Sequence, residues 1–209
     1  MTEADFVRNT RTSYDAMATA YNETYRHTLR DDPMERAMLA VFAEQVDGPV
    51  ADLGCGNGRI TGHLKGLGLD VFGVDLSPGM LAIARAQVPG VDFREGSLLA
   101  LDLPDGSLGG LVAWYSIIHT PRELLPEVFA EFRRVLAPGG RAAVAFQTGT
   151  EAKHYEEGFG ARLDLTFYRN DPDEIAALLT KAGLDVRSTT VRQAERDEPT
   201  GQAYLMATG

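Results

Sequence analysis

Short apolar runs alternate with longer amphipathic stretches along most of the chain. This alternation is typical of βαβ units that build a parallel sheet. β-Branched and apolar positions predict five successive strands, over residues 49–53, 70–74, 91–94, 108–116 and 141–146. Two closing strands are predicted over residues 184–191 and 203–208. The pattern therefore predicts an α/β fold with a doubly wound sheet of seven strands.

Helical periodicity predicts the elements that surround this sheet. A first helix is expected over residues 9–25, because five residues fall on one helical face: Tyr14, Met17, Ala18, Tyr21 and Tyr25. Further helices are expected from near residue 32, over 57–67, over 77–88, from 120 to about 136, and from 171 to 183. Residues 147–170 follow neither the helical nor the strand period, so no element is predicted there.

Capping and turn residues set several expected boundaries. An N-cap acid, a proline and a glutamate follow one another in Asp32-Pro33-Met34-Glu35, which predicts a helix start. The same reasoning applies to Asp171-Pro172-Asp173-Glu174, and Gly183 ends that helix. Thr120-Pro121-Arg122-Glu123 is interpreted as a capping box. Pro138-Gly139-Gly140 predicts a turn before the fifth strand.

Composition narrows the class of protein. The chain has 209 residues, 44% of them apolar and 24% charged, which fits one domain with its own core. Its single cysteine, Cys55, excludes an intramolecular disulfide and favours a reducing cytoplasm. The sequence shows neither a bilayer-length apolar run nor the pattern of a signal peptide. A net charge of −10 argues against a nucleic-acid substrate.

A glycine-rich turn between a predicted strand and helix is the strongest chemical signal. Its sequence is Asp52-Leu53-Gly54-Cys55-Gly56-Asn57-Gly58. Glycines let the backbone approach a ligand closely, and the following helix offers free N–H groups. Asp75 ends the next strand, where a carboxylate can accept hydrogen bonds from both hydroxyls of a ribose. The two features together predict a nucleoside-containing cofactor.

Nicotinamide dinucleotides and S-adenosylmethionine both satisfy these two features. The spacing is G-x-G-x-G, with Arg59 and Ile60 where a dinucleotide site has its last glycine. Asp52 would repel a pyrophosphate but suits a cationic ammonium or sulfonium. We therefore favour a methyltransferase over a nicotinamide-dependent oxidoreductase. A non-catalytic module that keeps the cofactor fold is a third reading, since an intact loop shows binding capacity rather than catalysis.

The sequence resembles the class I S-adenosylmethionine-dependent methyltransferases over nearly its whole length. Four pieces carry the resemblance, in the family's order: residues 52–58, Gly73-Val74-Asp75-Leu76-Ser77-Pro78-Gly79-Met80-Leu81, Leu103-Pro104-Asp105-Gly106-Ser107-Leu108 and Arg134-Val135-Leu136-Ala137-Pro138-Gly139-Gly140. The resemblance implies a Rossmann-like, mostly parallel sheet whose last strand is antiparallel. It also implies one domain over residues 1–209, made of a helical lid over 1–46 and a core over 47–209.

The resemblance further implies that S-adenosylmethionine is the methyl donor, S-adenosylhomocysteine the product and a small molecule the acceptor. It assigns cofactor contacts by position: Asp52, Gly54, Cys55 and Gly56 at the methionine part; Asp75 at the ribose; Leu76, Met80, Gly96, Ser97 and Leu98 at the adenine; Ala113, Trp114 and Tyr115 at the sulfonium; and Tyr14 and Tyr21 in the lid. Ser97 stands where the family often has an aspartate, and its hydroxyl or carbonyl can accept from the adenine amine.

Methyl transfer from a sulfonium needs alignment more than it needs reactive side chains. A base is required only when the nucleophile must lose a proton, and His119, after the fourth strand, is the candidate. Such a base would give an acidic limb near the ordinary imidazole pKa of about 6.5. Packing or capping is the alternative role for His119, and packing is the alternative for Tyr14 and Tyr21. No Cys/His cluster has metal-ligand spacing, so no metal is predicted, and a monomer or homodimer is expected.

Overall fold

A twisted sheet forms the centre of the structure, a computed structural model that describes residues 3–195 and 198–209; within them the sheet has seven strands. The strand order is β3-β2-β1-β4-β5-β9-β8, and β9 runs antiparallel to both of its neighbours. The strands are β1 Val50–Leu53, β2 Val71–Asp75, β3 Phe93–Glu95, β4 Leu108–Trp114, β5 Leu136–Gln147, β8 Asp185–Arg192 and β9 Gln202–Thr208. The predicted doubly wound α/β fold is confirmed.

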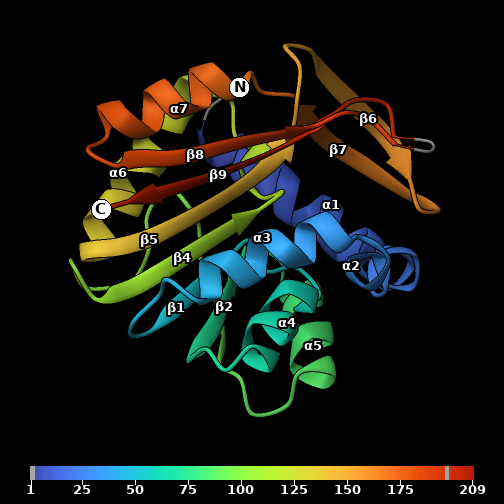
Figure 1. The fold of residues 1–209 in the computed structure, drawn as a ribbon. Coiled ribbons are helices and arrows are strands. Elements are labelled where there is room, and N and C mark those ends of the chain that lie inside the picture. The colour runs from blue at the N-terminus through green and yellow to red at the C-terminus, as the bar shows by residue number, and fades with distance from the viewer. Residues whose placement is uncertain (1–2, 196–197) are drawn as a thin grey trace.

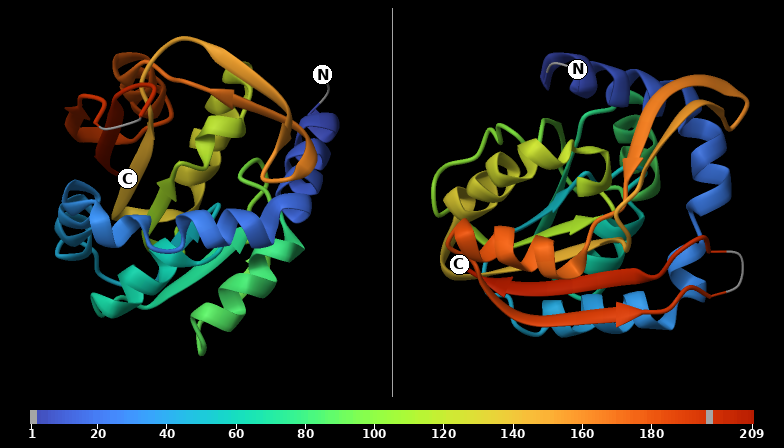
Figure 2. Two further views of the ribbon diagram at one scale, coloured as in Figure 1. Left: turned by 90° about the vertical axis from the view of Figure 1, so that its right-hand side faces the viewer. Right: turned by 90° about the horizontal axis from the view of Figure 1, so that it is seen from above.

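Helices cover both faces of this sheet (Figure 1). The helices and 3₁₀ turns are α1 Glu3–Tyr25, α2 Thr28–Asp31, α3 Pro33–Ala43, α4 Arg59–Gly66, α5 Pro78–Gln87, η1 Ile117–His119, η2 Arg122–Leu124, α6 Leu125–Val135 and α7 Pro172–Lys181. α3, α4 and α5 lie on one face, and α6 and α7 lie on the other. α1 crosses the end of the sheet at which the parallel strands finish (Figure 2).

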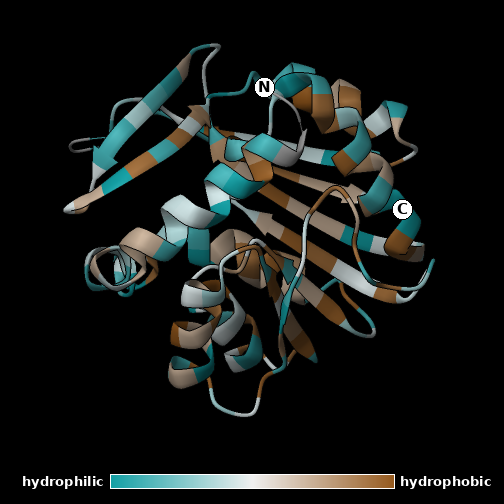
Figure 3. Ribbon diagram, turned by 180° about the vertical axis from the view of Figure 1, so that it is seen from behind, coloured by the Kyte–Doolittle hydropathy of each residue, from teal (hydrophilic) through white to brown (hydrophobic). Residues whose placement is uncertain are grey.

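Strand residues are buried on both faces because helices cover both. In β4, Leu111 and Ala113 pack toward α6 and α7, whereas Val112 and Trp114 pack toward α3 and α4. This alternation follows from the two-residue period of a strand. The apolar bands that result run across the middle of the sheet in Figure 3. Strands of this sheet are therefore apolar at consecutive positions, and not only at every second one.

The helix caps predicted at Asp32, Ser77 and Asp171 are present, and Ser77 Oγ accepts from the Met80 N–H at the start of α5. Asp32 Oδ1 accepts a hydrogen bond from the Glu35 backbone N–H at 2.9 Å, at the start of α3. Asp171 Oδ1 accepts from the Asp173 and Glu174 N–H groups at the start of α7. All three caps lie next to the helix they begin, so the local sequence suffices to form them.

The capping box predicted at Thr120 is wrong. A 3₁₀ turn follows Thr120, and α6 begins only at Leu125, with no side-chain cap. Thr120 is buried and lines the cavity described below, so tertiary packing directs its side chain away from the helix. Pro126 occupies the first turn of α6 instead, which suits a residue without an N–H donor.

The turn predicted at Pro138–Gly140 does not separate two elements. β5 runs through it, pairing Leu136 with Leu108 and, after a shift in register, Arg141 with Gly110. Gly139 has φ of +78°, and its N–H donates to the Gly209 carbonyl at 2.8 Å. The segment is a bend within a strand, because pairing with both neighbouring chain segments continues through it.

The segment without a predicted element, residues 147–170, folds as a hairpin outside the main sheet. It consists of β6 Ala152–Gly158 and β7 Ala161–Tyr168, joined through Phe159 and Gly160, both with positive φ. Its inner strand packs along α1, where the Asp164 N–H donates to Ser13 Oγ at 2.9 Å. The hairpin therefore supports α1 from the side opposite α5 (Figure 2).

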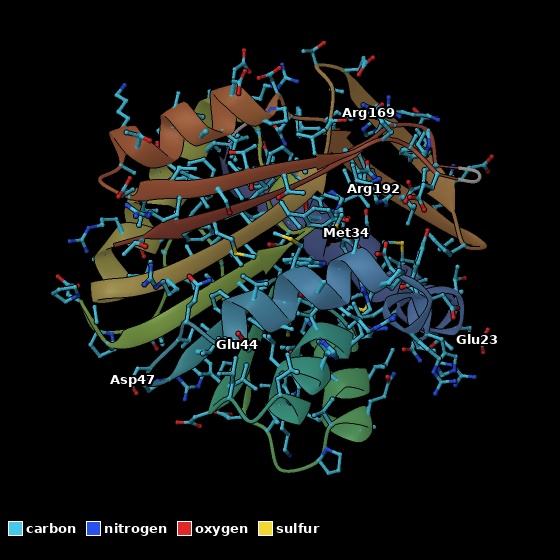
Figure 4. All side chains as sticks on the ribbon, viewed as in Figure 1. Glu23, Met34, Glu44, Asp47, Arg169 and Arg192 are labelled. Atoms are coloured by element: carbon cyan, nitrogen blue, oxygen red, sulfur yellow. The ribbon has the colours of Figure 1, made fainter. Side chains whose placement is uncertain are left out.

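Ion pairs also connect the end of β8 to the start of α3. Arg192 forms ion pairs with Glu198 at 2.7 Å and with Asp32 at 3.7 Å, and Figure 4 shows it beside Met34 of α3. α1 begins earlier than predicted, and α2 was not predicted. Among the described residues, none of the helices has the length and apolar character needed to span a membrane.

The close packing of β2 gives a test of this fold. A Cβ on Gly73 would lie 2.6 Å from the Phe93 ring and 2.7 Å from Cys55 Sγ, so we expect Gly73→Ala to lower the free energy of unfolding by about 1–3 kcal/mol. Gly66→Ala, in α4 with open space around the new Cβ, should raise it by about 0.4–1 kcal/mol. Urea denaturation of both variants measures the difference, and equal stability of the two would contradict this packing.

Candidate functional site

A cavity with an empty volume of about 940 Å³ lies under α1, at the carboxyl ends of the central strands. Its walls come from the loops after β1, β2, β3 and β4, and its cover comes from α1. This is the end at which open α/β sheets bind ligands. Among the described residues, no group of three or more His, Cys, Asp or Glu side chains could hold a metal ion.

Two residues of the glycine loop after β1 have backbone conformations that disfavour any side chain, and at one of them a side chain would also clash. Gly54 has φ of +76°, and a Cβ there would lie 2.3 Å from the Cβ of Ser116. Gly56 has φ of +52°, and a Cβ there would meet nothing within 4 Å. The Gly54 and Cys55 N–H groups both donate to the Val74 carbonyl, which ties the loop to β2. The loop therefore presents bare backbone to the cavity.

Asp75 connects this loop to the end of β2. Its Oδ2 accepts from the Gly56 N–H at 2.8 Å, and its Oδ1 accepts from the Ser77 N–H at 2.9 Å. Burial raises the pKa of Asp75, and these two N–H donors oppose that rise. A carboxylate oxygen has two acceptor positions, so each oxygen keeps one for a ligand. Asp75 can therefore receive two hydroxyl groups side by side.

Hydrogen bonds of Asp15 and Asn22 help to hold α1 over the cavity. Asp15 Oδ1 accepts from Ser77 Oγ at 2.5 Å and from the Gly79 N–H at 2.8 Å. Asn22 Oδ1 accepts from Asn57 Nδ2 at 2.9 Å. These contacts join α1 to the same loops that carry Asp75 and the glycines, so the cover and the floor of the cavity are coupled.

Tyrosines of α1 form part of the cavity wall and also pack together. Tyr14 and Tyr21 both line the cavity, with ring centroids 5.6 Å apart. Tyr21 also contacts Tyr25 at 4.6 Å and Phe159, from the hairpin turn, at 5.8 Å. Burial raises the pKa of both Tyr14 and Tyr21, so these phenols are neutral. Tyr14 and Tyr21 therefore pack against each other and also line the cavity, and their contact with a cofactor stays a prediction.

The end of β4 carries a strained backbone into the cavity. Tyr115 has φ of +57°, which is uncommon for a residue with a side chain and costs about 1–3 kcal/mol. Its N–H donates to the Ala145 carbonyl at 2.9 Å, and its ring meets that of Trp114 edge-on. This conformation places both Trp114, the last residue of β4, and Tyr115, which follows it, on the cavity wall.

His119 joins three elements through two hydrogen bonds. Its Nδ1 lies 3.0 Å from the Thr166 carbonyl of β7, and a carbonyl only accepts, so Nδ1 carries the proton. Its Nε2 lies 2.8 Å from the Tyr14 hydroxyl and therefore accepts from it. Burial lowers the pKa of His119 to about 4. The imidazole is thus neutral at pH 7, and its one basic nitrogen already accepts the hydrogen bond of the Tyr14 hydroxyl.

Asp52 lies behind the glycine loop and does not line the cavity. It is 1% exposed, and its Oδ2 accepts from Thr61 Oγ1 at 2.6 Å. Burial raises the pKa of Asp52 to about 7, while the Thr61 hydrogen bond and the charge of Arg59 oppose the rise. Asp52 therefore supports the base of α4 and acts on the cavity only through its charge.

Similar proteins establish the family. A family model described as a methyltransferase domain matches residues 50–140. Methyltransferase GfsG of Streptomyces halstedii is 35% identical over 170 residues, which are 76% of this chain and 60% of GfsG. A demethylmenaquinone methyltransferase of Chlorobaculum parvum is 30% identical over 179 residues, covering 82% of this chain and 71% of the relative. The chain belongs to the class I S-adenosylmethionine-dependent methyltransferase family.

The fold of a solved structure agrees with this membership. The structure of the DhpI–SAH complex superposes with a TM-score of 0.78 at 24% identity, over 99% of this chain and 98% of that one. GfsG is longer than its matched part: the match spans 60% of its length. The shared fold therefore extends over the present chain, whereas the shared sequence covers only part of GfsG.

Most residues that the sequence assigned to the cofactor line this cavity: Tyr14, Tyr21, Gly54, Cys55, Gly56, Asp75, Leu76, Gly96, Ser97, Leu98, Trp114 and Tyr115. The candidate base His119 lines it too. Met80 and Ala113 do not, because both are fully buried in the core beneath it. Asp52, as described above, lies behind the loop.

Sequence reasoning missed several lining residues. They are Phe6, Thr10, Asn57, Arg59, Ile60, Leu99, Ser116 and Thr120. Phe6 and Thr10 precede Tyr14 at intervals of four, on the same face of α1, so the periodicity could have found them had the helix been started earlier. Arg59 directly follows the glycine loop, and a positive charge next to a loop that binds a ligand is the sequence signal for it.

Burial of His119 predicts how the free energy of unfolding depends on pH. Its pKa in the folded state is about 4, below the unfolded value of about 6.5, so between these values only the unfolded chain binds the proton. Stability is therefore lost as pH falls through this window, by about 3 kcal/mol. We expect wild type to lose that much more than His119→Gln between pH 7 and pH 4 in denaturant titrations. Parallel losses in the two proteins would show that His119 titrates normally.

Proposed function

We propose that this protein transfers the methyl group of S-adenosylmethionine to a small-molecule acceptor by in-line displacement at the sulfonium methyl. The observation that carries the proposal is the Asp75 carboxylate, which joins the glycine loop and keeps two acceptor positions at the cavity. Family membership supports the same activity. S-Adenosylhomocysteine is then the product, and both molecules would use the same site.

The residues present fit the cofactor. Gly56 leaves an open cradle in which a side chain would stand, and Asp75 offers the acceptors that a ribose diol needs. Leu76 and Leu98 supply apolar walls for the adenine, with Gly96 and Ser97 at its edge. We propose that Gly54 and Cys55 line the methionine part. Met80 and Ala113 would then shape the site from below, through packing.

Around the reacting methyl group, the protein supplies aromatic faces. Bound S-adenosylmethionine contributes an electrophilic methyl on a sulfonium. We propose that Tyr14, Tyr21, Trp114 and Tyr115 surround this position. Aromatic faces attract a cation by about 0.5–2 kcal/mol and exclude water from the site. Since all four side chains are neutral, the wall stabilises positive charge without forming an ion pair.

The acceptor is proposed to enter between α1 and the hairpin. A smaller pocket there shares Phe6, Thr10 and His119 with the main cavity. Its remaining lining residues, Asn9, Asp164, Thr166 and Tyr168, are polar and carry no cationic side chain. Such walls suit a small acceptor that is neutral or positively charged at this end. The net charge of −10 disfavours a nucleic acid.

The proposal includes the domain organisation of the chain, its location and its oligomeric state. We propose a single domain over residues 1–209, in which residues 1–46 act as a lid over a core of 47–209. We expect the protein to work in the cytoplasm as a monomer or homodimer. The lid reading is supported by the hydrogen bonds of Asp15 and Asn22, which lie where α1 meets the loops of the cofactor site.

Two alternatives are less well supported. A nicotinamide dinucleotide requires space for a pyrophosphate at the glycine loop, where Arg59 and Ile60 replace the last glycine. A non-catalytic module has no need of a tautomer-fixed His119 facing the acceptor side. The strained Tyr115 likewise favours a working site, because strain persists where structure enforces it for function.

The cofactor assignment is tested by binding. Wild type should bind S-adenosylhomocysteine with a Kd in the micromolar range or tighter, about −8 kcal/mol. Asp75→Ala should weaken binding by roughly 2–4 kcal/mol, because two hydroxyls lose a charged acceptor. Asp92→Ala, a surface acid paired with Arg94, is the matched control and should bind normally. Titration calorimetry measures all three, and a wild type that binds NAD but no S-adenosylhomocysteine would exclude the methyltransferase.

The role of His119 is tested by rates with an identified acceptor. If His119 takes the acceptor proton, His119→Ala should lower kcat by roughly 10²–10⁴-fold with little change in cofactor affinity. The acidic limb of the wild-type rate should then lie near pH 4 rather than 6.5, because burial lowers the pKa. His27→Ala is the control, since His27 is exposed and lines neither pocket. A His119→Ala enzyme with wild-type kcat would leave the reaction to alignment alone.

A further inference from the structure

Arg59 is the one residue with a permanent positive charge among the described residues that line the cavity. It is the first residue of α4, directly after the glycine loop. Neither the glycine motif nor the acceptor chemistry accounts for a guanidinium here. A charged group on a cavity wall needs a partner of opposite charge, since its desolvation is otherwise uncompensated.

The partner that the protein provides is incomplete. Arg59 Nη1 lies 3.5 Å from Glu35 Oε2 of α3, at the outer limit of a hydrogen bond. The Arg59 side chain is 15% exposed and that of Glu35 is 9% exposed, so the pair is well shielded from solvent. A guanidinium carries five N–H donors, and one long contact uses only one of them. Donors therefore remain for an anion in the cavity.

Glu35 also interacts with the far wall of the cavity. Burial raises the pKa of the Tyr115 hydroxyl, which lies 3.5 Å from the Tyr204 hydroxyl, and the charge of Glu35 adds to that rise. Burial also raises the pKa of Tyr21 in α1, and the charge of Arg59 opposes that rise. The guanidinium therefore lies between α3, which holds it through Glu35, and the tyrosine wall under the cover helix. Glu35 is the positioning residue of this arrangement.

The loop places Arg59 and Asp75 at different parts of the same cavity. Asp75 binds the Gly56 N–H, and Arg59 lies beyond Gly58, at the other end of the turn. A carboxylate at Asp75 selects hydroxyl donors, and a guanidinium at Arg59 selects an anion. S-Adenosylmethionine has a ribose diol near one end and an α-carboxylate at the other. Asp75 therefore offers hydrogen-bond acceptors to the neutral diol, and Arg59 offers a charge opposite to that of the α-carboxylate.

We infer that Arg59, held by Glu35, binds the α-carboxylate of the amino-acid end of S-adenosylmethionine. This inference rests on the proposed function. A planar guanidinium can donate two parallel hydrogen bonds to a carboxylate, which adds direction as well as charge. Arg59 would then distinguish the complete cofactor from adenosine thioethers that lack an amino-acid group. It would also fix the direction in which the sulfonium methyl points.

The test pairs two ligands with changes at one residue. S-Adenosylhomocysteine carries the amino-acid end, whereas 5′-methylthioadenosine has the same adenosine thioether without it. By titration calorimetry, we expect Arg59→Met to weaken S-adenosylhomocysteine by roughly 10–150-fold, the value of a charged hydrogen bond. Binding of 5′-methylthioadenosine should change by less than about threefold, and this binding also shows that the variant is folded. Arg59→Lys should recover part of the loss, since it restores charge without the planar fork.

A control variant isolates the local effect from net charge. Lys65 is also in α4, but its Nζ donates to the Pro89 carbonyl outside the cavity. Lys65→Met should therefore leave both affinities unchanged. Equal weakening of both ligands by Arg59→Met, or no weakening of either, would overturn the inference and leave the cofactor assignment intact. A wild type that binds neither ligand would remove the proposed function and this inference together.

Discussion

The buried Asp75 carboxylate is the constraint on which the rest of the site depends. Burial disfavours its charge, and two backbone N–H groups, from Gly56 and Ser77, compensate only in part. Those same two bonds fix the loops after β1 and β2 relative to each other. Because one acceptor position on each oxygen stays open, a ligand with two adjacent hydroxyls completes the pairing. We propose that the group that orders the floor of the cavity also selects the ligand.

The cover of the cavity depends on this floor. Asp15 of α1 bonds Ser77, which Asp75 also holds, so the helix closes on a loop that the carboxylate has already positioned. The hairpin supports α1 from its other side through Ser13 and the aromatic contact of Phe159 with Tyr21. Three segments distant in sequence therefore meet above the sheet. A change in any one of them is transmitted to the cavity wall, since the wall is built from all three.

Few charged side chains line the cavity. Apart from Asp75 and Arg59, the described residues that line the cavity are neutral, including His119 and the tyrosines that surround it. A neutral wall suits a reaction in which a cationic sulfonium becomes a neutral thioether, because an ion pair would stabilise the starting charge more than the transition state. We propose that the protein contributes orientation, through the fixed tautomer of His119 and the enforced backbone of Tyr115.

The sequence by itself determined the features that depend on neighbouring residues. The caps at Asp32 and Asp171 and the glycine turn at residues 54–58 form as predicted, because a few adjacent backbone groups decide them. The positions of the sheet strands along the chain also followed from local apolar runs. The acid that ends β2 lies where the pattern placed it, because the carboxyl ends of parallel strands meet at one edge of a sheet.

Tertiary structure decided whatever depends on partners far along the chain. Thr120 turns into the cavity instead of capping a helix, and the hairpin over 147–170 is stabilised against α1 rather than by a long pattern of its own. His119 receives its tautomer from Thr166, 47 residues away, and its hydrogen-bond donor from Tyr14, 105 residues away. Burial, which lowers the pKa of that imidazole and raises that of Asp52, is a property of the packed molecule. A local pattern names the residue types, but only packing fixes their solvent exposure and their partners, and these set the chemistry.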